Sequence, residues 1–207
     1  MQVKSKPSVV AETSLKAMQE RLLHLLTEKS FQMSDTPEFP LASGTLSQYY
    51  IDCKKAFSYP EARESIGRLI AARCKGSNFT AVGGLVIGAY PVAIAVSDAL
   101  YRSEGREIRV FIVRKEPKKH GLRKRIDGDV EKGESVLVVD DVITSGGSTI
   151  EAIRQCREAG LTVVRAIAII DREEQDGRRH IEAEGVEFEA LYTLSDLKEH
   201  YESLHGR

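Results

Sequence analysis

The hydrophobic pattern becomes regular after residue 78, where short apolar runs alternate with longer segments whose apolar residues recur every three or four positions. The pattern predicts strands at 79–83, 108–113, 135–139 and 162–170 and helices at about 90–103 and 147–159. Continuous Val and Ile runs joined by amphipathic helices are typical of a parallel sheet covered on both faces. We therefore predict the α/β class with a doubly wound sheet, whose functional residues follow the carboxyl ends of the strands.

The first 60 residues follow a different pattern. A helix capped by Thr13 or Ser14 is predicted, because apolar residues from Leu15 onward lie three or four positions apart. Residues 30–48 are rich in Ser, Thr, Pro and Gly and lead into a short β-prone run that begins at Tyr49. Pro60 then favours the start of another helix.

Composition limits the classes of protein. The chain has 207 residues, enough for one compact domain, and its 30 basic and 31 acidic side chains give a net charge of −1. This balance argues against a wholly basic nucleic-acid or membrane-surface binder. The three Cys residues are not arranged in pairs, and no segment has the pattern of a secretory signal or a membrane span. We expect a cytoplasmic protein that uses neither nucleic acid nor membrane as a partner.

The strongest motif spans residues 136–149, VLVVDDVITSGGST. Asp140 and Asp141 come at the end of a predicted strand, and a turn rich in Thr, Ser and Gly follows before a predicted helix. The amide groups and the positive dipole at the start of a helix favour an anion, and glycines let it approach the backbone. The adjacent carboxylates accept hydrogen bonds and suit the hydroxyls of a sugar. The motif therefore predicts a sugar phosphate as ligand.

Other phosphate and acidic motifs fit less well. The stretch from Gly83 to Gly88 is followed by Ala89, where a Walker A loop needs Lys, and the chain lacks GxGxxG. Receiver domains also carry paired acids after a strand, but near their N-terminus rather than at residue 140.

The segment VLVVDDVITSGGST resembles the phosphoribosyl pyrophosphate (PRPP) motif of type I phosphoribosyltransferases. This resemblance implies their fold, a mostly parallel sheet flanked by helices with a small N-terminal hood. It assigns Asp140 and Asp141 to the ribose hydroxyls and residues 144–148 to the 5′-phosphate. The PRPP-binding residues that it implies in this segment are Asp140, Asp141, Val142, Ile143, Thr144, Ser145, Gly146, Gly147 and Ser148.

A second unusual segment, residues 114–125, contains seven Lys or Arg residues and one acid. It directly follows the predicted strand that ends at Val113, and Pro117 and Gly121 disfavour a regular helix. The composition and position favour a cationic lid over the site. A solvated basic surface loop is the alternative.

Within this segment, RKEPKKHG at 114–121 resembles the catalytic loop RKxxKxHG of orotate phosphoribosyltransferases. Three more blocks are similar to that family in the same order, namely FPLASGTLSQYYID at 39–52, IIDREEQDG at 169–177 and ALYTLSDL at 190–197. The resemblance implies that orotate is bound by Tyr49, Tyr50, Thr144 and Arg172. An arginine fork suits the carboxylate of orotate, and tyrosines suit its planar ring.

The resemblance also implies a reaction, in which orotate and PRPP give orotidine 5′-monophosphate and pyrophosphate with the help of Mg²⁺. Arg114, Lys115, Lys118 and His120 would bind PRPP, and the catalytic residues would be Lys118, His120 and Asp141. Mg²⁺ would be held mainly by PRPP, without a dedicated cage of protein ligands. Residues 1–207 would form one domain, with a helix and base-binding hood at about 13–60 and the α/β core at about 61–207. A homodimer that shares the catalytic loop between subunits is expected.

Two positions depart from the family pattern. Ala42 stands where one branch carries Lys, and Gly88 stands in a loop that often reads Tyr-Lys-Gly. A purine or other phosphoribosyltransferase is the alternative enzyme. A noncatalytic PRPP sensor that binds nucleic acid through residues 114–125 is the alternative from another class.

Overall fold

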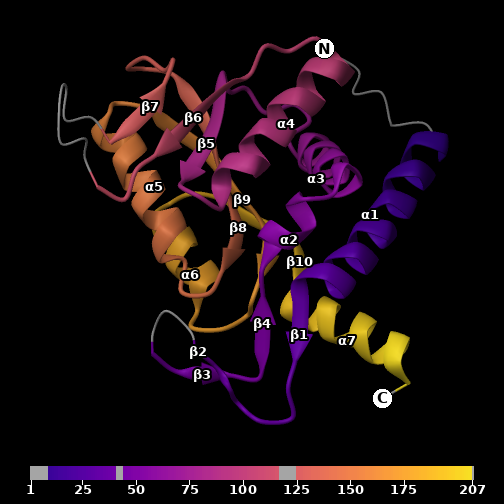
Figure 1. Cartoon of the computed structure of the whole chain (residues 1–207). Coiled ribbons are helices and arrows are strands. Elements are labelled where there is room, and N and C mark those ends of the chain that lie inside the picture. Colours follow the sequence, from indigo (N-terminus) through magenta and orange to yellow (C-terminus); the bar gives the residue numbers. More distant parts are fainter. Residues whose placement is uncertain (1–8, 41–43, 117–124, 207) are drawn as a thin grey trace.

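A six-stranded sheet forms the centre of the protein, seen in a computed structural model that describes residues 9–40, 44–116 and 125–206, with side chains from residue 14 onward (Figure 1). In spatial order the strands are β10 (Phe188–Thr193), β9 (Thr162–Asp171), β8 (Ser135–Ile143), β5 (Ala81–Leu85), β6 (Arg109–Val113) and β7 (Ile126–Gly128). All neighbouring pairs are parallel except β6 and β7. The carboxyl ends of five strands therefore share one edge of the sheet.

Helices cover both faces of this sheet, as Figure 1 shows. The helices on one face are α1 (Val9–Ser30), α2 (Cys53–Phe57), α3 (Pro60–Arg73), α4 (Ala89–Glu104) and α7 (Leu194–His205). The opposite face carries α5 (Gly147–Glu158) and α6 (Gly177–Glu182). The predicted α/β class with a mostly parallel, doubly covered sheet is confirmed.

Strand β8 shows how the apolar run builds two cores. Leu137 and Val139 belong to the core under α3 and α4, whereas Val136 and Val138 belong to the core under α5. Successive side chains of a strand point to opposite faces, so a strand buried on both faces must be apolar at every position. This requirement explains the continuous Val and Leu run in the sequence.

The N-terminal part adds a small hood to the sheet. Strands β1 (Phe31–Met33) and β4 (Tyr49–Ile51) form an antiparallel pair, and β2 (Phe39–Pro40) pairs with β3 (Leu46–Ser47). These strands lie in the lower part of the view in Figure 1. The strand predicted from Tyr49 and the helix predicted from Pro60 are both confirmed.

Three predicted elements have wrong boundaries. Strand β5 spans Ala81–Leu85 rather than 79–83, because its ladders with β6 and β8 begin at Ala81. The first helix begins at Val9 rather than at Thr13 or Ser14, because no Gly or Pro interrupts the chain after Pro7. Strand β8 continues beyond Val139 to Ile143, because its ladder with β9 extends to the pair of Ile143 and Asp171. In the part of the chain that the structure covers, no helix is both long and apolar enough to span a membrane.

Candidate functional site

The predicted site residues that the structure describes gather at the carboxyl edge of the sheet. Asp140 and Asp141 lie near the end of β8, the loop from Val86 to Gly88 follows β5, and Arg172 follows β9. The backbone N–H of Arg172 donates to the carbonyl of Ile143 at 3.0 Å, which joins the ends of β8 and β9. Parallel pairing thus brings together segments that are far apart in the sequence.

The two adjacent acids occupy different environments, because consecutive side chains of a strand face opposite ways. Asp140 is buried, and its Oδ2 accepts a 2.8 Å hydrogen bond from the hydroxyl of Thr149. Burial, followed by the nearby charge of Asp141, raises the pKa of Asp140 to about 7. Asp141 is half-buried. The site therefore presents Asp141 more openly than Asp140.

The predicted phosphate turn lies between β8 and α5. Gly146 has a φ of 78°, in the left-handed region, and α5 begins at the next residue. Ser145, Gly147 and Ser148 are exposed, so the start of α5 is open to an anion. Val142 and Ile143 belong to the strand, and the side chain of Ile143 is buried in the core. Ile143 therefore offers the site its backbone alone.

The phosphate turn packs directly against the segment after β9. A Cβ atom at Gly177 would lie 2.2 Å from the carbonyl oxygen of Thr144, a distance that no side chain tolerates. Only glycine permits this close backbone approach. Residues 144–146 and the segment that carries Arg172 are thus held side by side.

Gly88 explains one of the departures from the family pattern. A Cβ atom at this position would lie 2.2 Å from Oδ1 of Asp141. A lysine here would therefore displace the carboxylate of Asp141. The loop after β5 meets this acid through its backbone, without a side chain between them.

Arg172 is 5% exposed and is held by three hydrogen bonds. Its Nε donates to Oε2 of Glu174 at 2.8 Å, and its Nη2 donates to Oγ of Ser47 and to the carbonyl oxygen of Tyr49, both at 3.1 Å. Ser47 and Tyr49 belong to the hood, so the guanidinium connects the hood to the end of β9.

The two predicted tyrosines have different surroundings. The Tyr49 ring stacks on Phe31 at 6.1 Å between centroids and lies under the ammonium of Lys198. It is therefore engaged in packing, and its carbonyl is what meets Arg172. The Tyr50 ring packs against Phe39 at 5.6 Å and is 38% exposed. Tyr50 is the ring with more surface to offer a ligand.

The cationic segment connects β6 to β7. Its two ends are clamped together, since the backbone N–H of Arg114 donates to the carbonyl of Arg125 at 2.8 Å and Nη2 of Arg125 donates to the carbonyl of Lys115 at 2.6 Å. The Arg114 side chain forms an ion pair with Asp127 on β7. Lys118 and His120 lie outside the described residues.

Metal-ligating groups are sparse at this edge. Among the described residues, no cluster of three or more His, Cys, Asp or Glu side chains has the arrangement to hold a metal ion. Asp140, Asp141 and Glu151 are the acids nearest residues 144–148 along the chain, and Glu151 forms an ion pair with Arg125. A divalent cation here would need further oxygen ligands from its substrate and from water.

Two site residues are not apparent from the sequence alone. Ser47 and Glu174 hold Arg172 through hydrogen bonds to its guanidinium. Ser47 and Glu174 both lie in the blocks that resemble the family. Their contact across the hood becomes visible only in three dimensions.

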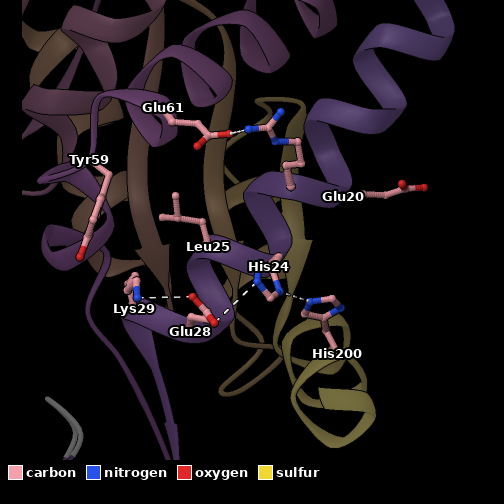
Figure 2. Close-up of a pocket in the computed structure, with 9 residues that line it drawn as sticks. Glu20, His24, Leu25, Glu28, Lys29, Tyr59, Glu61 and His200 are labelled. Atoms are coloured by element: carbon pink, nitrogen blue, oxygen red, sulfur yellow. Dashed lines mark hydrogen bonds and ion pairs between the residues drawn. The ribbon is translucent and has the colours of Figure 1, made fainter. Parts of the chain in front are cut away.

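A separate hollow of about 440 Å³ lies between α1, α3 and α7 (Figure 2). Nδ1 of His24 and Nε2 of His200 are 3.3 Å apart there, and Glu28 lies on the other side of the His24 ring. Burial and the proximity of His24 lower the pKa of His200. None of the described residues that line this hollow belongs to the predicted site.

Comparison with known proteins gives consistent results. A family model described as phosphoribosyl transferase domain matches residues 58–189. The chain is 42% identical over 178 residues to an orotate phosphoribosyltransferase of Aquifex aeolicus (strain VF5), covering 86% of this chain and 96% of the relative. The Mycobacterium tuberculosis H37Rv orotate phosphoribosyltransferase in complex with Fe(III) dicitrate has a TM-score of 0.75 at 34% identity, covering 87% of this chain and 98% of that one. A complex of the same enzyme with PRPP has a TM-score of 0.70 at 29% identity, covering 87% and 92%.

Proposed function

This chain belongs to the orotate phosphoribosyltransferases, and from that premise we propose that it transfers the phosphoribosyl group of PRPP to orotate. The products are orotidine 5′-monophosphate and pyrophosphate, in the pathway of pyrimidine biosynthesis. The observation that carries this proposal is the backbone contact between the phosphate turn, at Thr144, and the segment after β9, at Gly177. It holds the turn that suits a phosphate beside the segment that carries the buried Arg172, at one sheet edge.

Each part of the substrates has a matching part of this edge. The start of α5 suits the 5′-phosphate of PRPP, and the carboxylate of Asp141 suits the ribose hydroxyls. Arg172 suits the carboxylate of orotate, and the exposed ring of Tyr50 suits its planar ring. The two reactants would then meet at the anomeric carbon, between the phosphate turn and Arg172.

The cationic segment suits the leaving group. Departure of pyrophosphate concentrates negative charge on its oxygens, and a transition state of this kind is stabilised by positive groups placed in advance. Lys115 and Arg114 lie at the base of the segment on the carboxyl end of β6. We assign Lys118 the largest electrostatic contribution and His120 the role of an additional donor, on the resemblance of RKEPKKHG to the family loop.

We propose Mg²⁺ as the cofactor. The donor chemistry fits, because Mg²⁺ prefers oxygen ligands and retains several waters when it binds substrate phosphates. PRPP would supply most of its ligands, and the more open Asp141 would be the acid of the motif able to add an oxygen. Both carboxylate oxygens of the buried Asp140 already accept hydrogen bonds. When bound, the cation would neutralise charge on PRPP, whereas the orientation of the ribose and the base falls to the protein side chains.

We propose a homodimer, supported by an apolar flank on α4. Tyr90, Ile94 and Tyr101 are 47%, 40% and 60% exposed, and their spacing places them on one side of the helix. Ile87, in the adjoining loop, is 71% exposed. Exposed apolar patches of this kind mark association surfaces. Because the flank begins at the loop that meets Asp141, a second subunit bound here would lie near the active site.

The cytoplasm is the compartment that we propose. Cys53, Cys74 and Cys156 are all free thiols in the interior of the protein. Burial raises the pKa of each thiol, so none has the character of a reactive cysteine. Unpaired cysteines fit a reducing compartment.

Two other functions make different predictions. A purine phosphoribosyltransferase would consume adenine or hypoxanthine, and a PRPP sensor would bind RNA or DNA without turnover. Incubation of the protein with PRPP, Mg²⁺ and one base at a time distinguishes them. We expect consumption of orotate, with no consumption of adenine, hypoxanthine or uracil. Consumption of a purine instead of orotate would overturn the proposed function.

A further inference from the structure

We infer that Glu174 is a positioning residue for base recognition, which fixes the guanidinium of Arg172 so that its free edge faces the carboxylate of the base. This inference rests on the proposed function. Glu174 follows Arg172 by two residues and lies in the loop that leaves β9. It is not expected to touch the base itself, and it acts through Arg172 and the hood.

The carboxylate of Glu174 bridges two groups. Its Oε2 accepts from Nε of Arg172 at 2.8 Å, and its Oε1 accepts from Oγ of Ser47 at 3.3 Å. The same Ser47 hydroxyl oxygen accepts from Nη2 of Arg172 at 3.1 Å. Glu174, Arg172 and Ser47 thus form a closed ring of hydrogen bonds between the core and the hood. A charge-assisted pair of this geometry restricts the rotation of the guanidinium.

These contacts leave one edge of Arg172 for a ligand. A guanidinium has five N–H groups in a fixed planar fork. Glu174 takes the one on Nε, while Ser47 and the carbonyl of Tyr49 take those on Nη2. None of the described residues accepts a hydrogen bond from Nη1 of Arg172. The two N–H groups of Nη1 point in a direction set by the other three hydrogen bonds. A carboxylate on the base would therefore accept hydrogen bonds from Nη1.

The backbone of the loop is strained in a way that places Glu174. Glu173, Gln175 and Asp176 have φ values of 54°, 54° and 53°, which L-residues rarely adopt. Glu173 anchors the loop, since its Oε2 accepts from the backbone N–H of Ser195 at 3.1 Å and from its hydroxyl at 2.5 Å. Such conformations persist where the surroundings enforce them, and they concentrate at functional sites. Here they turn Glu173 toward α7 and Glu174 toward Arg172.

A competing role for Glu174 predicts the opposite change in the KM for orotate. A carboxylate beside Arg172 could act as a stand-in for the base carboxylate, which the substrate would have to displace. Removal of Glu174 would then lower the KM for orotate. Because Glu174 binds Nε and not Nη1, we expect removal to raise that KM instead.

The test is a comparison of the Glu174→Ala, Glu174→Gln and Glu187→Ala variants in the full-length enzyme. For Glu174→Ala we expect the KM for orotate to rise about 10-fold or more, as for the loss of one hydrogen bond to a charged group. The KM for PRPP and the kcat should change less than about 3-fold, a split that general destabilisation would not produce. Glu174→Gln keeps an acceptor for Nε and should restore the orotate KM to within about 3-fold of the wild-type value.

Glu187→Ala is the matched control, because Glu187 pairs with Arg165 near the amino end of β9, away from the site. It should leave both KM values unchanged. An unchanged or lowered orotate KM in Glu174→Ala would overturn the inference, as would an equal rise in the KM for PRPP. If the alanine variant does not fold, Ser47→Ala provides the second test, with the same split expected at smaller size. Absence of turnover in the wild-type enzyme would instead refute the proposed function.

Discussion

Asp140 accepts a 2.8 Å hydrogen bond from the hydroxyl of Thr149, in the first turn of the helix that follows the phosphate turn. Both residues are buried, with exposed fractions of 5% and 2%. The bond ties the end of β8 to α5 beneath the turn, so the phosphate site is supported by a titratable group. This support makes the free protein sensitive to pH.

Asp140→Asn should remove part of that pH dependence. The pKa of Asp140 is raised to about 7, from 3.8, by burial and by Asp141. Between pH of about 4 and about 7 the folded protein therefore keeps a proton that the unfolded chain loses, and the stability of the wild type falls as pH rises. The melting temperatures of the two ligand-free proteins should be compared across this range. As the pH rises from about 4 to about 7, the melting temperature of the variant should increase by several degrees relative to that of the wild type. Parallel curves would contradict the assignment.

Thr149→Val sharpens the same test. The Thr149 hydrogen bond favours the charged form of Asp140, so its loss should raise the pKa of Asp140 further. The decline in stability should then extend to higher pH than in the wild type. A decline that ends at the same pH in both proteins would show that this hydroxyl does not control the titration.

Gly88→Ala should weaken PRPP binding. The added Cβ would lie 2.2 Å from Oδ1 of Asp141, so that carboxylate must move from the position that we propose for contact with the ribose hydroxyls. We expect the KM for PRPP to rise roughly 10-fold, the scale of one lost hydrogen bond to a charged group. Gly76→Ala is a control for a strained glycine substitution away from the site. Its Cβ would have open space, but its φ of 84° disfavours a side chain, so this variant should lose stability without a change in the KM for PRPP. Equal PRPP constants for Gly88→Ala and the wild type would be incompatible with this role of Asp141.

Arg172→Lys should weaken the binding of orotate and leave the binding of PRPP nearly unchanged. Lysine keeps the positive charge, but it lacks the planar fork that binds Glu174, Ser47 and a ligand at once. We expect the KM for orotate to rise roughly 10- to 100-fold and the affinity for PRPP to stay within about 3-fold of the wild type. Calorimetric titration with each substrate measures the affinities for orotate and for PRPP separately. Equal loss of both affinities would show that Arg172 has a general structural role.

Lys118→Ala should lower kcat by about 100-fold or more, which is the scale for loss of one charge donor placed for the transition state. Lys75→Ala is the control, because Lys75 is exposed and lies before the amino end of β5, whereas the site lies at the carboxyl end. Steady-state kinetics with both substrates saturating give the comparison. A kcat equal to that of the wild type would mean that residues 114–125 form only a basic surface.

Mixing of two inactive variants tests the shared site. If Lys118 serves the neighbouring subunit, Lys118→Ala and Asp141→Asn subunits should recover activity when mixed, because some mixed dimers then hold one intact site. About a quarter of wild-type activity is expected for random pairing of equal amounts, by the symmetry of a two-subunit assembly. Absence of recovery, with light scattering showing mixed dimers, would contradict the sharing of the loop.

Local periodicity was sufficient to predict the main elements of the core. The runs around Val82, Leu137 and Ile167 are buried on both faces, so their sequences carry a signal at every position. The run around Phe111 is apolar as well, although Val110 and Ile112 are only half-buried. Strand β7 lacks such a run, because it has three residues at the sheet edge and none of them is fully buried. It is recognisable only through its pairing with β6.

The site was predictable in its residue types and less so in its contacts. Asp140 and Asp141 are equivalent in the motif, but the continuation of β8 to Ile143 sends their side chains to different environments. The role of Glu174 depends on the left-handed backbone of Glu173, Gln175 and Asp176. Because none of these three residues is a glycine, the sequence does not indicate this turn. Tertiary geometry, rather than composition, determines that Glu174 is the carboxylate that contacts Arg172.

The most direct test of the proposed function follows orotate and pyrophosphate in one reaction with PRPP and Mg²⁺. If the phosphate turn and Arg172 bind the two substrates for one transfer, one pyrophosphate should be released for each orotate consumed, and release should stop when orotate is withheld. Pyrophosphate release that continues without orotate, or that follows a purine instead, would contradict this account.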